Sequence, residues 1–506
     1  MPVDYFDDKA IRLGLRNKTI RGGAYTAVSQ GIRTVAMLIV TPLLTRLLQP
    51  EDFGLVAMAM VVTGFAGMFV DAGLSMATVQ REQLTHQQAS NLFWVASILG
   101  TTIAAICVCL SPIFAIFFQD DRLTFIIMGS STAFIINGLA IQYRAMLRRG
   151  LQFVDLAIAD IGSILFGQAI GLSWAFAYSG SDGDYWALVL IPVCAAFASL
   201  LIVYWRCHWR PSFFQRGAGT RSMIFFGANL TGFNTLNFFA RNADNLLIGW
   251  WWGPTQLGFY SRIYQVMMLP VQRLNGPLTA LVVPVLSRVQ KEDRKYQDIY
   301  RWTVERLLLI SCPAMAYIAV TADWVTVAYF SEAFAPAGPM LRWLALAALW
   351  QSLSASIGWL FISQGRDREM FRWGVIHSTA VVLSFLIGLP FGATGVAIAY
   401  CCTFNGFCLP LAFWLISRKG PIDIRLLTGV VLNVGPVAAM VGISTLLARH
   451  LMPSFDLWIS LLVTAIVAAV AWLLSMISLP FGRQVLTQSW GGLRNNFSRL
   501  SSSNVA

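Results

Sequence analysis

Long apolar stretches recur along the whole chain and are separated by short polar ones. Each is long enough for the roughly 20 residues with which a helix crosses about 30 Å of hydrocarbon. The stretches do not alternate polar and apolar positions, as the strands of a membrane β-barrel do. The pattern predicts an all-α integral membrane protein of about fourteen transmembrane helices, the first at residues 23–48 and the last at residues 457–479.

Positive charge is distributed unevenly between the two sets of loops that connect these helices. Of the 36 lysines and arginines, 27 lie in one set together with the two termini, and only Arg46, Arg122 and Arg449 lie in the other. Cytoplasmic loops of membrane proteins are enriched in Lys and Arg. We therefore expect a multi-pass protein of the bacterial inner (cytoplasmic) membrane with both termini cytoplasmic. The basic residues of the expected cytoplasmic loops then account for the net charge of +12, and we expect no nucleic-acid partner.

Two segments of the chain resemble one another, RLLQPEDFGLVAMA at residues 46–59 and WWWGPTQLGFYSRIY at residues 250–264. In each, we expect a proline and a glycine to bracket a tight outer turn. An arginine inside an apolar stretch precedes each segment, Arg33 the first and Arg241 the second. The similarity indicates an internal repeat.

The repeat predicts two lobes of six helices around a central cavity, followed by a terminal helix pair. We place the N-terminal lobe at residues 1–210, the C-terminal lobe at 211–417, and the terminal pair with a cytoplasmic tail at 418–506. In transporters built from parallel repeats, the substrate site lies between the halves near the membrane midplane.

Arginines inside the apolar stretches are the candidate substrate-binding residues. An arginine at the centre of a membrane helix costs at least about 2.5–3.5 kcal/mol, so it is kept where a partner, water or a ligand offsets that cost. A guanidinium stays charged and presents a planar fork of donors that suits phosphate. Arg33 lies roughly 15 Å into the first span. The residues assigned to this role are Arg33, Arg241, Arg273 and Arg262.

Simpler interpretations of some arginines are open. Arg241 stands three residues before Asp244, a spacing that also favours an internal salt bridge. Arg262 lies nearer the outer surface, where it could be an interfacial anchor. Arg306 and Arg342 lie near helix ends, where an arginine side chain reaches the interface by snorkelling.

Acidic and amide side chains in the apolar stretches complete the candidate site. We expect the acids to balance the arginines or to couple transport to an ion; these are Asp71, Asp155, Asp160 and Asp244. The amides are candidates for hydrogen bonds with sugar hydroxyls; these are Gln30, Asn234 and Asn237. Amides in membrane helices equally bond neighbouring helices.

No sequence pattern of catalysis or metal binding is present. The chain contains neither a G-x-x-x-x-G-K-[ST] loop nor an H-E-x-x-H helix, and its four histidines are scattered. None of its eight cysteines forms a CxxC pair. We therefore expect no catalytic residues, no metal site and no cofactor.

Three segments closely resemble a known family: LLTRLLQPEDFGLVAMAMVVTGFAGMFVDAGLSMATVQRE, FFARNADNLLIGWWWGPTQLGFYSRIYQVMMLPVQRLNGPL and PVLSRVQKEDRKYQ. They are similar to Wzx-type polysaccharide transporters (flippases) of the multidrug/oligosaccharidyl-lipid/polysaccharide exporter superfamily, in the branch of colanic acid and teichuronic acid exporters. The resemblance covers roughly residues 20–420. The run Trp250–Trp252 before Gly253 departs from the usual family pattern.

The resemblance implies two six-helix lobes, a central cationic cavity and alternating access. The cargo that it implies is an undecaprenyl-diphosphate-linked oligosaccharide, with polymerase and chain-length proteins of the same pathway as partners. In the family, cavity arginines meet the diphosphate, which points here to Arg33 and Arg241.

Two other functions stay open from the sequence. A drug or cation antiporter of the same superfamily would carry more buried carboxylate than arginine. A membrane polysaccharide polymerase or ligase would need a substantial outer loop, and the expected outer loops are only a few residues long.

Overall fold

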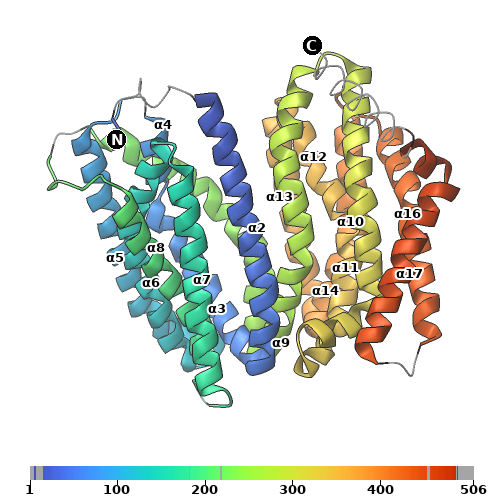
Figure 1. Ribbon diagram of the computed structural model, residues 1–506, viewed down its shortest axis with the longest axis horizontal. Helices are drawn as coiled ribbons and strands as arrows, with labels where there is room; N and C mark the ends of the chain where they lie inside the picture. The colour runs from blue at the N-terminus through green and yellow to red at the C-terminus, as the bar shows by residue number, and fades with distance from the viewer. Residues whose placement is uncertain are drawn as a thin grey trace, which may run out of the picture. The chain divides into compact units, whose positions relative to one another are not determined.

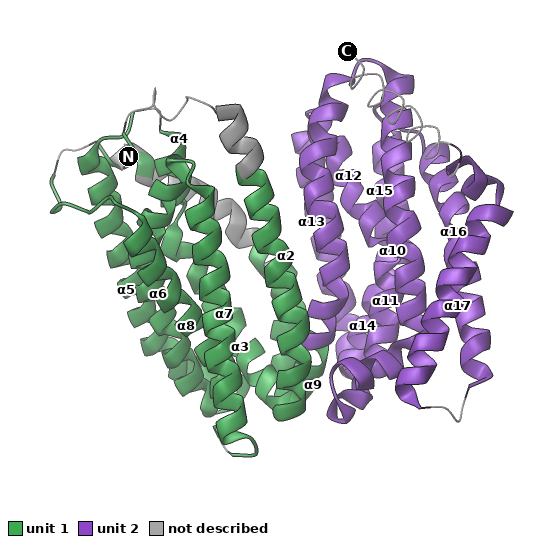
Figure 2. Cartoon of the chain, viewed as in Figure 1, with its two compact units in different colours: residues 1–261 green, residues 262–506 purple. Residues whose placement is uncertain are grey.

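The structure is a computed structural model that describes residues 5–6, 15–81, 83–181, 183–216, 219–452, 456–485 and 487. For residues 15–21, 221–222, 224–237 and 239–240 it describes the backbone alone. Within these ranges every regular element is helical (Figure 1), which confirms the predicted all-α class. The chain divides into two compact units, residues 1–261 and 262–506 (Figure 2). The expected six-helix lobes with a boundary after residue 210 stay a prediction.

Unit 1 consists of long, mainly apolar helices joined by short connections. Its elements are α2 (Leu15–Leu47), α3 (Pro50–Asp71), α4 (Leu74–Gln80), α5 (His86–Phe118), α6 (Arg122–Arg149), α7 (Phe153–Tyr178), α8 (Trp186–Arg206) and the first part of α9 (Arg221–Arg288). Within the unit, α5 packs against α6, α7 against α8, and α2 against α7.

Unit 2 begins within α9 and ends with two long helices. Its other elements are α10 (Asp293–Tyr329), η1 (Glu332–Ala337), α11 (Gly338–Ala348), α12 (Gln351–Ser363), α13 (Asp367–Gly388), η2 (Leu389–Phe391), α14 (Gly392–Thr403), η3 (Phe404–Cys408), α15 (Leu409–Ser417), α16 (Ile424–His450) and α17 (Leu457–Ser478). The terminal helices α16 and α17 pack against each other and against α10.

Twelve helical segments of the described chain are long and apolar enough to cross a membrane, where the sequence predicts about fourteen. Two of the twelve, Arg241–Arg288 and Asp367–Ser417, are 48 and 51 residues long. Each contains a glycine in the left-handed region of backbone space, Gly253 at φ 78° and Gly392 at φ 80°. Glycine adopts this conformation readily because it has no Cβ. The continuous apolar segments are therefore broken where these glycines lie.

The two repeated segments contact each other within unit 1. A Cβ added to Gly54 would overlap the backbone carbonyl of Pro254, and one added to Gly258 would lie 2.7 Å from the carbonyl carbon of Pro50. The contact is thus reciprocal, with each glycine against the proline of the other copy. Small residues at a helix crossing allow two backbones to approach closely.

The expectation that proline and glycine bracket a turn is wrong. Pro50 is the first residue of α3, and Gly54 lies one turn inside the helix. Neither Gly54 nor Gly258 is among the glycines with positive φ. Pro50 suits the first helical position because the missing N–H has no intrahelical acceptor there. Gly54 and Gly258 therefore allow two helices to approach closely, and they do not form the turn.

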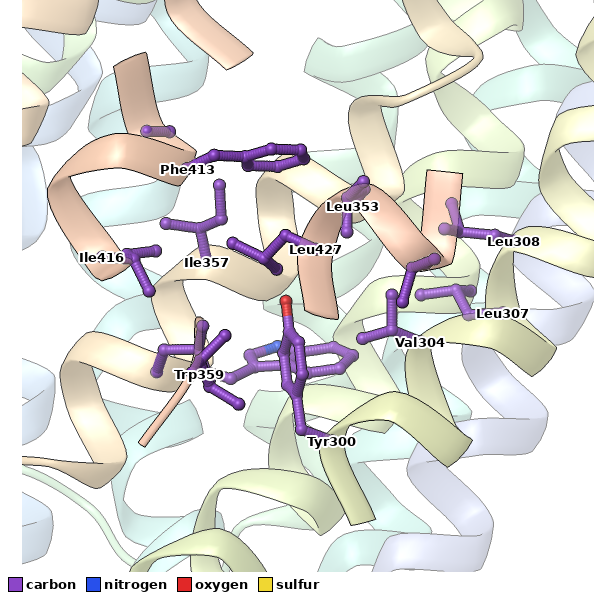
Figure 3. Close-up of a cluster of buried hydrophobic side chains, with 14 of the residues drawn as sticks. Tyr300, Val304, Leu307, Leu308, Leu353, Ile357, Trp359, Phe413, Ile416 and Leu427 are labelled. Carbon is purple, nitrogen blue, oxygen red and sulfur yellow. The ribbon is translucent and has the colours of Figure 1, made fainter. Parts of the chain in front are cut away.

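The core of unit 2 is built around aromatic side chains of α10 and α12. Tyr300 and Trp359 are almost completely buried, and aliphatic residues of α12, α15 and α16 converge on them (Figure 3). Their polar atoms are satisfied, because the hydroxyl of Tyr300 lies 2.9 Å from that of Ser356 and the indole of Trp359 donates to Thr279 at 2.7 Å. Helix α16 therefore belongs to the packed core of unit 2.

Candidate functional site

Arg33 lies in the middle part of the candidate membrane span Gly22–Leu47, on α2. Its side chain is exposed, as are the apolar side chains of its neighbours Ile32 and Val35. It forms no hydrogen bond or ion pair with any described residue. An apolar helix therefore carries, near mid-span, an exposed guanidinium that has no partner among the described residues.

Arg241 precedes the second repeated segment, on α9. Its side chain is also exposed, and no described residue pairs with it. The salt bridge with Asp244 that the spacing allows is not formed. Asp244 is 3% exposed and accepts hydrogen bonds from the Tyr260 hydroxyl at 3.0 Å and from the backbone N–H of Asn245 at 2.8 Å. Asp244 thus contributes to the packing of unit 1, and its carboxylate is occupied by neutral donors.

Arg306 and Arg342, on α10 and α11, differ from Arg33 and Arg241 in having partners. The guanidinium of Arg306 lies 4.0 Å from the ring centroid of Trp302, an arrangement that suits an interfacial anchor. Arg342 is paired with Asp323 at 2.7 Å, and the same carboxylate pairs with Arg449 at 2.9 Å. The side chain of Arg342 is therefore held by an ion pair and not by snorkelling alone.

Arg262 and Arg273 lie in the second half of α9, within unit 2. Arg262 donates to the side chain of Gln265 at 2.9 Å, and Arg273 is half-buried between Pro270 and Pro277. Both arginines have contacts in the fold. Their assignment to the substrate site stays a prediction.

The candidate acids pair with residues other than Arg33 and Arg241. Asp160 pairs with Arg144, a contact that ties α6 to α7, and Asp155 pairs with Arg206 at 3.3 Å.

Asp71 is the last residue of α3 and caps the start of α4. It accepts from the backbone N–H of Ser75 at 2.9 Å and from its hydroxyl at 2.6 Å. Among the described residues, none of the four candidate acids balances the charge of Arg33 or Arg241. A role of these acids in ion coupling stays a prediction.

The candidate amides are only partly visible in the structure. Gln30 lies one turn before Arg33 on α2 and is exposed. It therefore shares a helix face with the guanidinium. The side chains of Asn234 and Asn237 lie outside the described part of the chain.

Comparison with known proteins identifies the family. A family model described as polysaccharide biosynthesis protein matches residues 43–339. The chain belongs to this family. It is 24% identical over 395 residues to the lipopolysaccharide biosynthesis protein WzxC of Escherichia coli (strain K12), covering 77% of this chain and 79% of WzxC. It is 22% identical over 466 residues to the succinoglycan biosynthesis transport protein ExoT of Rhizobium meliloti (strain 1021), covering 90% of this chain and 91% of ExoT.

The fold is similar to that of the lipid II flippase MurJ in an inward closed conformation. The TM-score is 0.70 at 11% identity, covering 90% of this chain and 98% of MurJ. At this identity the similarity concerns the fold alone. Together the matches confirm the predicted resemblance to polysaccharide transporters and make this member of the polysaccharide biosynthesis family a multi-pass membrane protein.

One cluster of this polysaccharide biosynthesis protein was not predicted from the sequence. Arg149, at the end of α6, is 6% exposed, and its guanidinium bonds the carbonyl oxygens of Tyr5, Thr78 and Arg81. The phenol of Tyr5 donates to Gln152 at 2.6 Å, and burial raises its pKa above the ordinary value. In the sequence, Arg149 looks like an ordinary loop arginine. The carbonyls that it binds lie in distant segments, so the local sequence does not reveal them. Its satisfied state contrasts with the open guanidinium of Arg33.

Proposed function

We propose that the protein is a flippase that moves an undecaprenyl-diphosphate-linked oligosaccharide from the cytoplasmic to the outer leaflet, for exopolysaccharide, capsule or O-antigen assembly. The observation that carries this proposal is the state of Arg33 and Arg241. Both are exposed, and both lie on apolar helices before a repeated segment. Neither has an ion-pair partner in the described part of the chain.

The energetic argument favours an anionic ligand for these arginines. A cation near mid-membrane costs about 2.5–3.5 kcal/mol unless a partner offsets it. Arg144, Arg206 and Arg342 have carboxylates, whereas Arg33 and Arg241 do not. A diphosphate offers oxygens that a guanidinium binds in a bidentate manner. A cationic drug would be repelled by the same groups.

We further propose fourteen membrane crossings with both termini cytoplasmic. The breaks at Gly253 and Gly392 divide the two longest of the twelve apolar segments, and counting each half as a crossing gives fourteen. This even number agrees with the alternation of positive charge between loops. Transport then proceeds by alternating access, in which the arginines are exposed first to one side of the membrane and then to the other.

The test is a set of arginine variants in a strain that lacks the chromosomal copy. Arg33→Ala and Arg241→Ala should abolish surface polysaccharide while the protein still accumulates in the membrane. Arg33→Lys should retain part of the activity, because it keeps the charge but not the planar fork. The matched control is Arg306→Ala, since Arg306 lies over Trp302 and has no role in the proposal.

Normal polymer from both alanine variants would overturn the proposed site. Normal polymer together with new sensitivity to cationic dyes would support a drug or cation antiporter instead. Glycosyl transfer by the purified chain would support a polymerase or ligase.

A further inference from the structure

Helix α10 contains a proline whose missing hydrogen bond is supplied by another helix. Pro313 has no backbone N–H, so the carbonyl of Leu309, four residues earlier, loses its usual donor. The indole N–H of Trp472, on α17, donates to this carbonyl at 2.9 Å. Leu309 is 4% exposed, so water does not replace the lost bond.

A second proline, in α5, removes a helical hydrogen bond that a side chain of the same helix replaces. Pro112, in α5, frees the carbonyl of Val108 in the same way. There the hydroxyl of Ser111, in the same helix, donates to Val108 at 2.8 Å. The freed carbonyl in α5 therefore receives a donor from its own helix, whereas the freed carbonyl in α10 receives its donor from α17.

The surroundings of Trp472 strengthen the link between α10 and α17. Its ring packs against buried residues of the two neighbouring helices α10 and α16, among them Leu309 and Val437. The two helices are joined again further along, where the Tyr317 hydroxyl donates to a backbone carbonyl of α17 at 3.1 Å. α10 and α17 thus share two hydrogen bonds that involve backbone carbonyls.

We propose that Trp472 is a positioning residue for transport, which fixes α10 to the terminal helix pair by donating to the carbonyl that Pro313 frees. The inference rests on the proposed transport function. A membrane interior offers no water to an unsatisfied carbonyl, so separating α17 from α10 leaves that group without a donor. The two helices therefore move together when the protein changes conformation, and the terminal pair takes part in the transport cycle.

A double-mutant cycle tests the inference in the full-length protein. Trp472→Phe keeps an aromatic ring but removes the N–H, whereas Pro313→Ala restores an N–H that can donate to Leu309 within the helix. We expect Trp472→Phe to lower surface polysaccharide several-fold and to lower the unfolding temperature of the detergent-solubilised protein. Pro313→Ala should suppress both defects when combined with Trp472→Phe, because the carbonyl no longer needs the indole.

Two control variants separate this bond from general effects. Trp458→Phe changes another tryptophan of α17 that is 59% exposed, and it should leave both measurements unchanged. Pro436→Ala restores an N–H in α16 and should not rescue Trp472→Phe.

The combined measurements distinguish failure of this inference from failure of the proposed function. If Pro313→Ala does not raise the unfolding temperature of Trp472→Phe, the hydrogen-bond argument is overturned. If Trp472→Phe unfolds more easily but exports normally, while Arg33→Ala abolishes polymer, the positioning role is overturned and the proposed function stands. If Arg33→Ala and Arg241→Ala also leave polymer normal, the proposed substrate site, on which the proposed function rests, is overturned. Should Trp472→Phe not accumulate, recovery of the double variant supports the inference and its absence counts against it.

Discussion

The reciprocal contact between the two repeated segments makes a sharp prediction about alanine. Gly54→Ala would place a Cβ against the backbone carbonyl of Pro254. Gly258→Ala would place one 2.7 Å from the carbonyl carbon of Pro50 and 3.1 Å from the nitrogen of Gly54. In both cases the obstacle is backbone, which cannot rotate away as a side chain does. The helices would have to separate.

The expected magnitude follows from two opposing effects. Overpacking costs typically about 1–3 kcal/mol, and the rigid backbone obstacle places these sites at the upper end of that range. Alanine in a helix gains roughly 0.5–1 kcal/mol over glycine. Each variant should therefore lose about 2–2.5 kcal/mol of unfolding free energy. The double variant should lose less than the sum, because both methyl groups enter the same contact and one separation accommodates both.

Thermal unfolding of the detergent-solubilised protein measures these losses. Gly276→Ala is the matched control, since this glycine lies on the same helix as Gly258 and a Cβ there meets nothing within 4 Å. Its unfolding temperature should equal or exceed that of the wild type. If Gly54→Ala and Gly258→Ala are as stable as Gly276→Ala, the close contact between the copies is refuted.

Two further predictions concern buried or shared carboxylates, both read from unfolding temperature. Tyr260→Phe should cost about 1.5–3 kcal/mol, because it removes a donor from the buried carboxylate of Asp244; an unchanged unfolding temperature would contradict this. Asp323→Ala should cost about 1 kcal/mol, since Arg342 and Arg449 lose a shared partner that is only partly buried. That difference from the wild type should shrink at high salt, and a salt-independent difference would argue against an electrostatic cause.

The class of fold was predictable because membrane helices are encoded locally. Hydropathy marks each apolar stretch without reference to the rest of the chain. The sequence also places span boundaries at residues 250–256 and 390–393, where the structure has the breaks at Gly253 and Gly392. The similarity of the two repeated segments was also visible. That Gly54 and Gly258 contact the opposite prolines was not, because a repeat does not specify where its copies meet.

The sequence singles out the candidate arginines but not the contacts that the candidate arginines and acids make. Depth in an apolar stretch is enough to single out Arg33 and Arg241. The spacing of Arg241 and Asp244 suggested a pair, but Tyr260, sixteen residues further on, occupies the carboxylate instead. The pairing of Asp160 with Arg144 likewise depends on how α6 packs against α7. Such contacts are set by tertiary packing, and the spacing of residues along one helix does not reveal them.

The hydrogen bond from Trp472 also has a consequence for biogenesis. The indole and the carbonyl of Leu309 are 163 residues apart in the sequence. At about 5–20 residues per second, a ribosome needs roughly 8–30 s to reach the tryptophan after it has made the leucine. During that interval the carbonyl of Leu309 lacks its donor from α17, so we expect the nascent chain to depend on temporary partners such as the insertion machinery until α17 is made.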